Sequence, residues 1–278
     1  MDIITKLIKQ ALAEDVGDGD HTSRATIPES AQGTMKLLVK EDGVIAGVEI
    51  ARLVFQEVDE DIIMDIMMRD GAHVKKGDVV FYISGSCLSM LTAERTVLNF
   101  MQRMSGIATS THHYCETLAG AKTRLLDTRK TTPNMRIFEK MAVAIGGGQN
   151  HRMGLYDMIM IKDNHVDFAG GIQQAIEVTQ TYVKKLGKDL KIEIEVRNFS
   201  ELDEVLHIGQ VDRIMLDNFT PENLKRAIQL IDGKYETEAS GNITLMNIKE
   251  YALSGVDYIS VGAITHHIKS LDLSLKSC

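Results

Sequence analysis

The sequence predicts an α/β protein whose second half forms a parallel barrel or an open parallel sheet. Short apolar strands alternate with helices between residues 124 and 262. The segment MIMI is apolar on both faces, as parallel strands covered by helices usually are. Nearly every strand ends in a polar residue. The predicted strands are RLLD (124–127), MIMIK (158–162), KIEIEV (191–196), RIMLD (213–217), ETEAS (236–240) and YISVG (258–262).

Polar strand ends are compatible with two architectures, since barrels and doubly wound sheets both bind ligands at the carboxyl ends of their strands. We favour a barrel because many different strands contribute polar residues. A dinucleotide-binding fingerprint is also missing, because the GGG at 146–148 is not GxGxxG and follows no clear strand.

The first third of the chain lacks this regular alternation. Helical spacing predicts helices over 2–14 and 48–58, and strands are predicted over 34–39 and 78–83. Residues 17–23 have turn composition, and 70–78 predict a hairpin-like loop. The loop resembles the turn of biotin- or lipoyl-carrying modules, but the two helices argue against such a small all-β domain. A long helix is predicted from residue 91, with an interruption at Gly106.

Helix ends are predicted from local composition. Ser200 is expected to cap one helix, and Thr220 to cap another that has Pro221 at its first position. Gly255 stands where a C-cap glycine would.

Composition limits the class of protein. The chain has 278 residues and a net charge of −8, which argues against a nucleic-acid partner. No run of 18 apolar residues predicts a membrane helix, and acidic residues near the N-terminus do not fit a secretory signal. Three cysteines without metal-binding spacing favour a reduced, cytoplasmic setting.

A basic cluster between residues 127 and 165 stands out on this acidic chain and predicts a pocket for a small anion. Arg129 and Lys130 directly follow a strand, and Arg152 and Lys162 complete the cluster. Arginine and lysine at strand ends suit carboxylate or phosphate. The alternative is that these side chains only pair with neighbouring acids such as Glu139 and Asp163. His151 either takes part in this site or is a hydrogen-bonded structural histidine.

Acidic and small residues end the later strands. Glu193 and Glu195 face the same side of one strand, and Asp217 ends the next. Such carboxylates suit Mg²⁺, ribose hydroxyls or a structural ion pair. Ser240, Gly241 and Asn242, like Gly262 and Ala263, are candidates for phosphate binding through main-chain N–H groups.

Eight motifs, in order along nearly the whole chain, resemble those of the quinolinate phosphoribosyltransferase family. They are AEDVGDGDHTS (13–23), AERTVLNFMQRMSGIAT (93–109), DTRKTTP (127–133), GGGQNHRMGLYDMIMIKDNH (146–165), EIEV (193–196), IMLDN (214–218), EASGN (238–242) and ISVGAITH (259–266).

The resemblance implies an N-terminal α/β sandwich domain (1–106), joined by the C-terminal tail (267–278), and an incomplete, seven-stranded α/β barrel (107–266). It implies a pentosyltransferase that joins quinolinate to 5-phosphoribosyl-1-pyrophosphate with Mg²⁺. The products are nicotinate mononucleotide, pyrophosphate and CO₂, in NAD biosynthesis. A homodimer with shared active sites is expected.

The resemblance also implies roles for single residues. Arg129, His151, Arg152 and Lys162 would hold the two quinolinate carboxylates, and Arg95 would reach the neighbouring subunit's site. Thr128 lies in the same substrate-binding motif, where Lys130 would contact phosphate or pyrophosphate. Glu195 and Asp217 would bind the ribose hydroxyls and Mg²⁺, and Ser240–Asn242 with Gly262–Ala263 the 5′-phosphate. The catalytic residues are Lys130, Lys162, Glu195 and Asp217.

Two positions depart from the family pattern, since Asn134 and Asn242 replace common glycines. Asparagine tolerates left-handed backbone, so both loops can keep their shape. Three other functions compete: a molybdenum-associated pyrophosphorylase-like relative, a nicotinate phosphoribosyltransferase and a non-enzymatic anion-binding protein. The intact IKDNH segment argues against the first of these functions. The two arginine clamps argue against the second, and the acidic residues argue against the third.

Overall fold

The computed structural model describes residues 2–278, which form two compact units. Unit 1 contains the chain up to His112, together with Thr131–Gly147 and Ile264–Cys278. Unit 2 contains His113–Lys130 and Gly148–Ala263. No helix among residues 2–278 combines the length and apolar character required to cross a bilayer.

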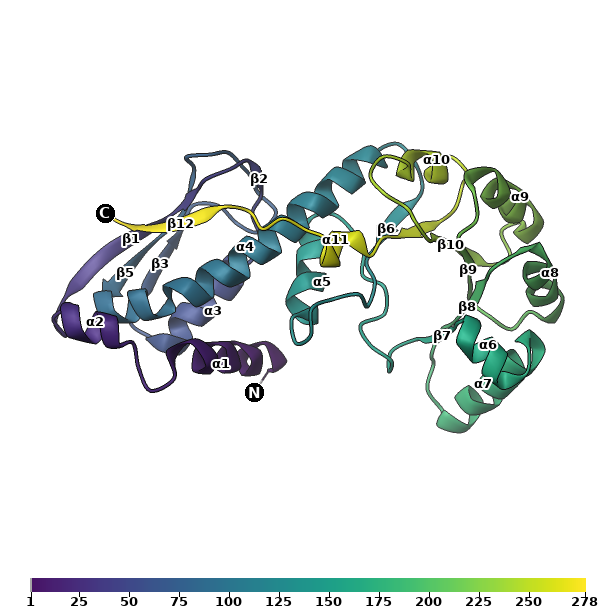
Figure 1. Cartoon of the computed structure of the whole chain (residues 1–278), viewed down its shortest axis with the longest axis horizontal. Helices are drawn as coiled ribbons and strands as arrows, with labels where there is room; N and C mark the ends of the chain where they lie inside the picture. Colours follow the sequence, from purple (N-terminus) through teal and green to yellow (C-terminus); the bar gives the residue numbers. More distant parts are fainter. Residues whose placement is uncertain (1) are drawn as a thin grey trace. The chain divides into compact units, whose positions relative to one another are not determined.

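Unit 1 is built on an antiparallel sheet of four strands in the order β12-β1-β5-β3 (Figure 1). The strands are β1 (Gln32–Val39), β3 (Ile63–Ile66), β5 (Val79–Ser86) and β12 (Leu273–Ser277), and a separate pair joins β2 (Gly43–Val44) to β4 (His73–Val74). The helices are α1 (Ile3–Val16), α2 (His21–Thr26), α3 (Val48–Val58), α4 (Cys87–Thr117, which continues into unit 2), α5 (Arg136–Ile145) and α11 (Ala263–His266).

The core of unit 1 lies between this sheet and its helices. Phe55 of α3 and Phe81 of β5 are almost completely buried, and their rings meet edge to face at 6.3 Å. The C-terminal segment enters the same core, since Leu275 of β12 is buried and pairs with Leu37 of β1. The expected return of the tail to the first domain is thus present.

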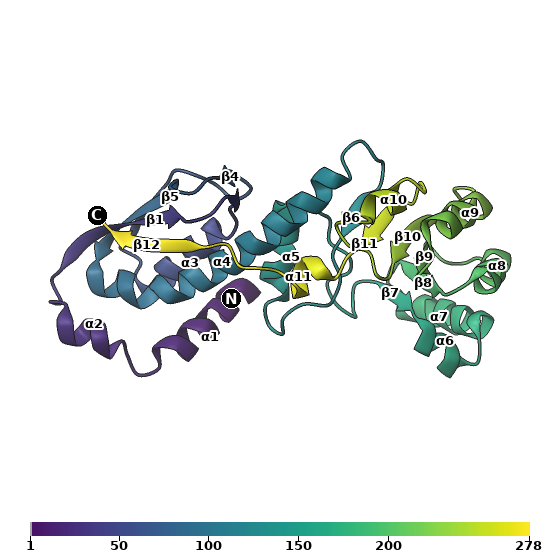
Figure 2. The same ribbon diagram turned by 45° about the horizontal axis from the view of Figure 1, so that its top comes forward.

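Unit 2 is a parallel α/β layer in the strand order β6-β11-β10-β9-β8-β7, with helices along its outer side (Figures 1 and 2). Its strands are β6 (Arg124–Leu126), β7 (Ile159–Ile161), β8 (Ile192–Val196), β9 (Arg213–Asp217), β10 (Glu236–Ser240) and β11 (Tyr258–Ser260). Its helices are α6 (Asp163–Ala169), α7 (Ile172–Leu186), α8 (Phe199–Ile208), α9 (Pro221–Ile231) and α10 (Ile248–Ala252).

The α/β class is confirmed, but the expected seventh strand of the barrel is reduced to one bridge. Gln149 pairs in parallel with Leu126, and the described sheet otherwise has six strands. The chain leaves this edge at once because Asp127 accepts hydrogen bonds from Asn150 Nδ2 (2.7 Å) and from the main-chain N–H of His151 (2.8 Å). Hydrogen bonds to the Asp127 carboxylate thus replace the main-chain hydrogen bonds of a further strand there.

The units also divide the chain differently from the expected boundaries at 106 and 266. Residues Thr131–Gly147 belong by their contacts to unit 1. The reason is visible at Glu139, which is fully buried and accepts hydrogen bonds from Arg103 of α4 and from the Thr132 main chain.

Four local predictions were wrong. Gly255 is not a C-cap, because α10 ends at Ala252 with Leu253 as its C-cap. Helix α4 continues through Gly106. Because Gly106 has no side chain, the main chain at Lys269 can pass close to the helix, whereas a Cβ at Gly106 would collide with the Lys269 carbonyl oxygen. Within the predicted 17–23 turn, Asp20 caps α2 by accepting from Ser23 N. Helix α8 is capped by Asn198 and not by Ser200, because the Asn198 side chain accepts from Glu201 N.

Candidate active site

The carboxyl ends of β7, β8, β9 and β10 bring together the polar residues that the sequence placed at strand ends. Lys162 follows β7 and its Nζ lies 3.3 Å from Glu195 Oε2 of β8. Asp217 ends β9, and its Oδ1 accepts a 2.6 Å hydrogen bond from Ser240 Oγ at the end of β10. Parallel register aligns Asp217 with Ser240. Four neighbouring strands therefore present a lysine, two acids and a serine at one edge.

The two carboxylates at this edge influence each other. Burial raises the pKa of Glu195, the nearby Asp217 raises it further, and the Lys162 ammonium opposes both. The net shift is upward. Asp217 Oδ2 accepts from Asn218 Nδ2 at 2.6 Å. An additional cation would stabilise the ionised form of both acids.

Arg152 and Arg129 form the basic group of the candidate site. Burial lowers the pKa of Arg152, and the positive charge of Arg129 lowers it further. The Arg152 guanidinium is held by a 3.1 Å hydrogen bond from Nη1 to the Met158 carbonyl oxygen. Two guanidinium groups that repel each other create a site whose best ligand is an anion with more than one negative group.

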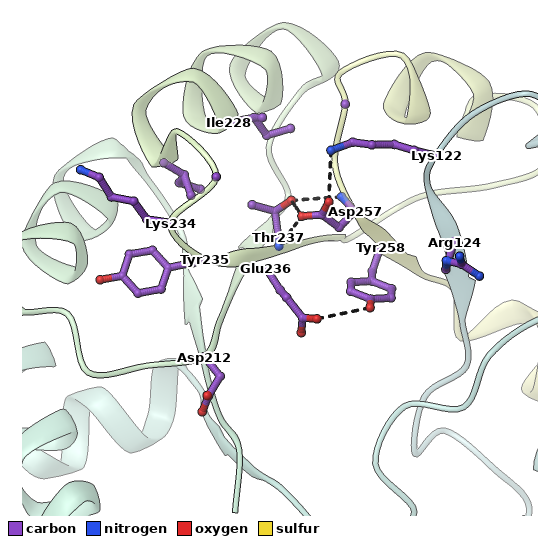
Figure 3. A pocket seen from close by; sticks show the side chains of 13 residues that line it. Lys122, Arg124, Asp212, Ile228, Lys234, Tyr235, Glu236, Thr237, Asp257 and Tyr258 are labelled. Carbon is purple, nitrogen blue, oxygen red and sulfur yellow. Dashed lines mark hydrogen bonds and ion pairs between the residues drawn. The ribbon is translucent and has the colours of Figure 1, made fainter.

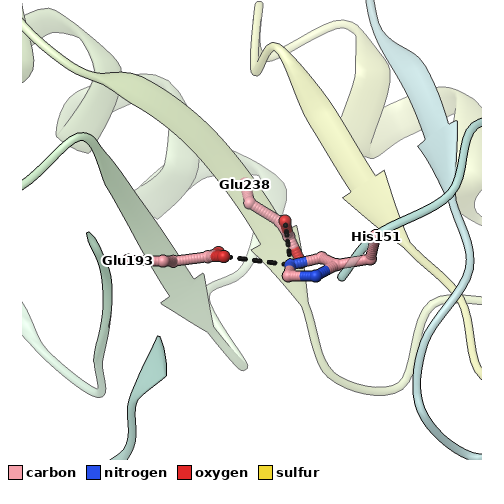
Figure 4. A group of neighbouring side chains, drawn as sticks. All are labelled: His151, Glu193 and Glu238. Carbon is pink, nitrogen blue, oxygen red and sulfur yellow. Dashed lines mark hydrogen bonds and ion pairs between the residues drawn. The ribbon is translucent and has the colours of Figure 1, made fainter. Parts of the chain in front are cut away.

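His151 occupies a buried position against two strands (Figure 4). Its Nε2 lies 2.9 Å from Glu193 Oε2 of β8 and 3.3 Å from Glu238 Oε2 of β10. Its Nδ1 accepts the main-chain N–H of Arg152 at 2.7 Å. Only 5% of the side chain is exposed. His151 is therefore a hydrogen-bonded interior residue in this structure, one of the two interpretations that the sequence left open.

The protonation of this cluster follows from its hydrogen bonds. Burial alone would lower the pKa of His151, but hydrogen bonds to Glu193 and Glu238 raise it to about 9. The N–H of Arg152 opposes the doubly protonated ring, because it would face a second N–H at 2.7 Å and lose its acceptor. The contact at Nδ1 therefore favours a ring hydrogen on Nε2. Burial and the charge of Glu238 raise the pKa of Glu193 to about 7.

The loop after β10 has the backbone shape expected of its small residues. Gly241 has φ +91° and Asn242 φ +52°, so both are left-handed. A Cβ on Gly241 would collide with Asn218 Oδ1, and that oxygen accepts from Asn242 Nδ2 at 3.1 Å. Asn134 is also left-handed, at φ +63°. Both asparagines thus have the left-handed backbone that glycine favours, and the prediction that they preserve the shape of the two loops stays a prediction.

A hollow at the opposite, amino-terminal end of the strands does not belong to this site (Figure 3). It has a volume of about 560 Å³ and is lined by Lys122, Tyr235, Glu236 and Asp257, among others. Its acids already have partners, since Asp257 binds Lys122 and Thr237, and Glu236 binds Arg213 and Tyr258. We place the candidate site at the carboxyl end, where the parallel strands bring Lys162, Glu195, Asp217 and Ser240 together.

The remaining predicted residues lie as follows. Arg129 and Lys130 are exposed after β6, where Thr128 Oγ1 accepts from Lys130 N at 3.0 Å, and Gly262 and Ala263 follow β11. Arg95 is exposed on α4 and belongs to unit 1, whereas the edge just described belongs to unit 2. Glu238 was not among the residues predicted from the sequence, although it alternates with Glu236 and Ser240 on one face of β10.

Comparison with known proteins identifies the family. The model of the N-terminal domain of quinolinate phosphoribosyl transferase matches residues 20–105, and that of its C-terminal domain matches residues 107–276. The chain belongs to the quinolinate phosphoribosyltransferase family.

Family relatives match along nearly the full length. The chain is 46% identical to the chloroplastic nicotinate-nucleotide pyrophosphorylase (carboxylating) of Arabidopsis thaliana, covering 97% of this chain and 81% of the relative. The structure of NadC from Streptococcus pyogenes superposes with a TM-score of 0.93 at 41% identity, covering 99% of this chain and 97% of that one. The nicotinate-nucleotide pyrophosphorylase of Francisella tularensis gives a TM-score of 0.92 at 42% identity, covering 100% and 96%. The predicted family is confirmed.

Proposed function

We propose that this protein transfers the phosphoribosyl group of 5-phosphoribosyl-1-pyrophosphate to quinolinate and releases pyrophosphate and CO₂, which forms nicotinate mononucleotide for NAD biosynthesis. The observation that carries the proposal is that one unit contains the interacting arginines Arg129 and Arg152 together with the Lys162–Glu195 and Asp217–Ser240 pairs. The family relatives named nicotinate-nucleotide pyrophosphorylase support the same activity.

The basic side of the site suits quinolinate. Quinolinate is a planar dicarboxylate, so Arg129 and Arg152 can each meet one negative group through a planar, bidentate contact. Lys162 has three N–H donors and uses one of them on Glu195, so a second carboxylate oxygen can bind the same ammonium group. Binding of the diacid relieves the repulsion between the two guanidinium groups.

The acidic side suits the phosphoribosyl donor. Glu195 and Asp217 supply carboxylate oxygens, the ligands that Mg²⁺ prefers when it is shared with substrate phosphates. Their donor chemistry and mutual repulsion fit such an ion, which when bound would absorb negative charge on the pyrophosphate. Lys130 would contact the phosphate or pyrophosphate oxygens.

The chemistry requires positioning more than an activated side chain. The ring nitrogen of quinolinate attacks C1 of the ribose as the bond to pyrophosphate breaks, and carboxylates near C1 stabilise its cationic character. When CO₂ departs, the electron pair of the broken bond stays on ring C2, where the positive charge of the adjacent quaternised nitrogen stabilises it until C2 takes up a proton. Correct placement of two reactants can contribute about 7–11 kcal/mol.

The phosphate end and the assembly complete the proposal. Main-chain N–H groups of Ser240–Asn242 and Gly262–Ala263 would bind the 5′-phosphate. Arg95 would enter the site of a second subunit in a homodimer, with no nucleic-acid or membrane partner. The three cysteines of the described chain form no disulfide, which supports a reducing compartment such as the cytoplasm.

A direct assay tests the function. Purified protein with quinolinate, 5-phosphoribosyl-1-pyrophosphate and Mg²⁺ should release CO₂ and nicotinate mononucleotide in equal amounts. Turnover should vanish when nicotinate replaces quinolinate, since a single carboxylate cannot satisfy both arginines. Absence of turnover in folded protein, or equal use of nicotinate, would refute the proposal.

A further inference from the structure

We infer that Arg103 and Glu139 are positioning residues for the phosphoribosyl donor, because the ion pair between them holds two chain segments that lead directly from the proposed phosphate-binding residues. We call this ion pair the clasp. The inference rests on the proposed function for its kinetic part and on contacts within unit 1 for its structural part. Neither side chain is assigned a contact with a substrate.

The clasp joins a half-exposed base to a fully buried acid. Arg103 of α4 donates to Glu139 Oε1 of α5 from Nε (3.1 Å) and from Nη2 (2.8 Å). None of the Glu139 side chain is exposed, against 28% of Arg103. A buried carboxylate without a partner is strongly destabilising, so the guanidinium is confined to this position. The other contacts of Arg103 and Glu139 are therefore made from fixed points.

The acid of the clasp holds the segment that follows Lys130. Glu139 Oε2 accepts the main-chain N–H of Thr132 at 3.1 Å, two residues after Lys130. The N–H of Lys130 itself donates to Thr128 Oγ1 at 3.0 Å. The main chain at Lys130 and just beyond it is thus bound by side-chain oxygens. The lysine proposed to contact the pyrophosphate therefore depends on the clasp for the course of the chain after it.

The base of the clasp holds the segment that follows Ala263. Arg103 Nη2 donates to the carbonyl oxygen of Thr265 at 2.7 Å, two residues after Ala263. Thr265 is fully buried. The same nitrogen lies 3.3 Å from Thr132 Oγ1. One guanidinium nitrogen thus contacts both segments, although they are far apart in the sequence.

The phosphoribosyl donor makes their relative position important. It carries pyrophosphate on C1 and phosphate on C5 of the ribose, so the groups that bind its two ends need a defined separation. A displacement of about 1 Å caused by a remote residue can lower the rate about 10²-fold. The quinolinate side has other supports, since Arg152 is held by the Met158 carbonyl oxygen and Lys162 by Glu195. The clasp therefore acts on the donor more than on quinolinate.

Two other interpretations compete with positioning. In one, Arg103 itself binds a donor phosphate through its exposed part. Its Nε and Nη2 are already used on Glu139 and Thr265, which argues against this. In the other, the clasp only stabilises unit 1. Substitutions that separate stability from donor binding distinguish the three.

Arg103→Met/Glu139→Met removes the clasp without leaving an unpaired buried charge, so this double variant should stay folded. We expect its Kd and KM for 5-phosphoribosyl-1-pyrophosphate with Mg²⁺ to rise about ten- to a hundredfold, with quinolinate affinity nearly unchanged. Calorimetry and initial rates measure these values. Glu139→Gln keeps Arg103 and an oxygen for it, but turns an amide NH₂ toward the N–H of Thr132. It should also weaken donor binding.

The matched control is Lys9→Met/Glu57→Met. This 3.0 Å ion pair joins α1 to α3, two helices of unit 1 without a predicted site residue. It should leave both affinities unchanged. Normal donor affinity in the folded clasp double variant would overturn the inference. A loss in that variant with normal affinity in Glu139→Gln would show that Arg103 binds the donor itself, which would also overturn it.

Hydrogen exchange of ligand-free protein, followed by NMR, gives a readout that needs no reaction. We expect the Thr132 amide to exchange faster in Glu139→Gln than in wild type, because it loses its acceptor. The Val39 amide, bound to the Asp78 carbonyl oxygen, should stay protected. Unchanged exchange at Thr132, or equal acceleration at Val39, would overturn the inference. Wild-type protein that shows the expected exchange but does not bind the donor would count against the proposed function instead.

Discussion

The ammonium group of Lys162 lies 3.3 Å from Glu195 Oε2, so the ends of the neighbouring strands β7 and β8 are joined by an ion pair. The pair is unequal, since 44% of the Lys162 side chain is exposed but only 10% of Glu195. The lysine therefore faces outward with unused donors, while the acid stays inside. This arrangement allows one lysine to neutralise an enzyme carboxylate and to contact an incoming anion.

Removal of the Arg152 guanidinium should weaken quinolinate binding selectively. We expect Arg152→Ala to reduce quinolinate affinity by roughly ten- to a hundredfold, the cost of a lost charge-assisted hydrogen bond, and to spare the phosphoribosyl donor. Calorimetry measures both affinities. Arg52→Ala is the control, because Arg52 is bound to Glu49 on α3 of unit 1. Unchanged quinolinate affinity in Arg152→Ala would exclude that clamp.

The proposed sharing of active sites can be tested by complementation. Arg95→Ala and Lys162→Ala should each be inactive alone, because each removes a cation from every site. Mixed dimers should regain some activity, since one of their sites would be wild type at both positions. Each variant mixed only with itself controls for refolding. Lack of recovery after demonstrated subunit exchange would argue for self-contained sites.

Neutralisation of Asp217 should affect the reaction of the phosphoribosyl donor and leave quinolinate binding unchanged. Asp217→Asn keeps an oxygen for Ser240 but loses the charge, and we expect turnover to fall by about 10²–10³. Raised Mg²⁺ should partly restore it, while calorimetry should find quinolinate affinity unchanged. Asp212→Asn, which precedes the opposite end of β9 and accepts from Ile192 N, serves as the control. Normal turnover in Asp217→Asn would remove this residue from the metal site.

The left-handed backbone at Asn242 predicts opposite effects of two substitutions. Asn242→Gly should change the free energy of unfolding by less than about 1 kcal/mol, whereas Asn242→Val should destabilise by about 1–2 kcal/mol, because a β-branched residue is strained at φ +52°. Urea unfolding measures both. Equal stability of the two variants would show that the loop can change conformation at little cost.

The Lys122–Asp257 ion pair predicts a dependence of stability on pH. Burial alone would raise the pKa of Asp257, but hydrogen bonds from Thr237 and the charge of Lys122 lower it below 3.8. Its stabilisation is therefore complete above pH 3.8 and is lost as the pH falls through the lower folded-state value. Asp257→Asn should be less stable than wild type at neutral pH and lose less stability between about pH 5 and about pH 3. Parallel curves for both proteins would contradict this.

Much of the architecture was predictable because it depends on local periodicity. Helix α3 and strand β9 have the predicted bounds, since apolar spacing and flanking turn residues define both ends. The cap of α8 was placed on the wrong residue because Asn198 and Ser200 are both good caps, and only the backbone conformation separates them. Gly106 was interpreted as a helix break because the reason for a glycine there is its close contact with Lys269, and the sequence does not show contacts between residues so far apart.

The gathering of polar residues at one edge was predictable, but not their network of contacts. Polar strand ends were sufficient to predict that Lys162, Glu195 and Asp217 lie close together, and their roles in a site stay predictions. Periodicity cannot show which side chain a histidine faces, so the position of His151 between Glu193 and Glu238 required the structure. The role of Arg95 depends on a second subunit and stays a prediction.

The pairing of β12 with β1 has a consequence for biosynthesis. All of unit 2 lies between these two strands in the chain, so a nascent polypeptide must carry an open β1 edge until Leu273–Ser277 have left the ribosome. Unit 2, by contrast, can assemble from contiguous β and α segments as they emerge. We therefore expect ribosome-bound chains to protect unit 2 from proteases before unit 1, and expect chains truncated before Leu273 to aggregate through the unpaired β1 edge.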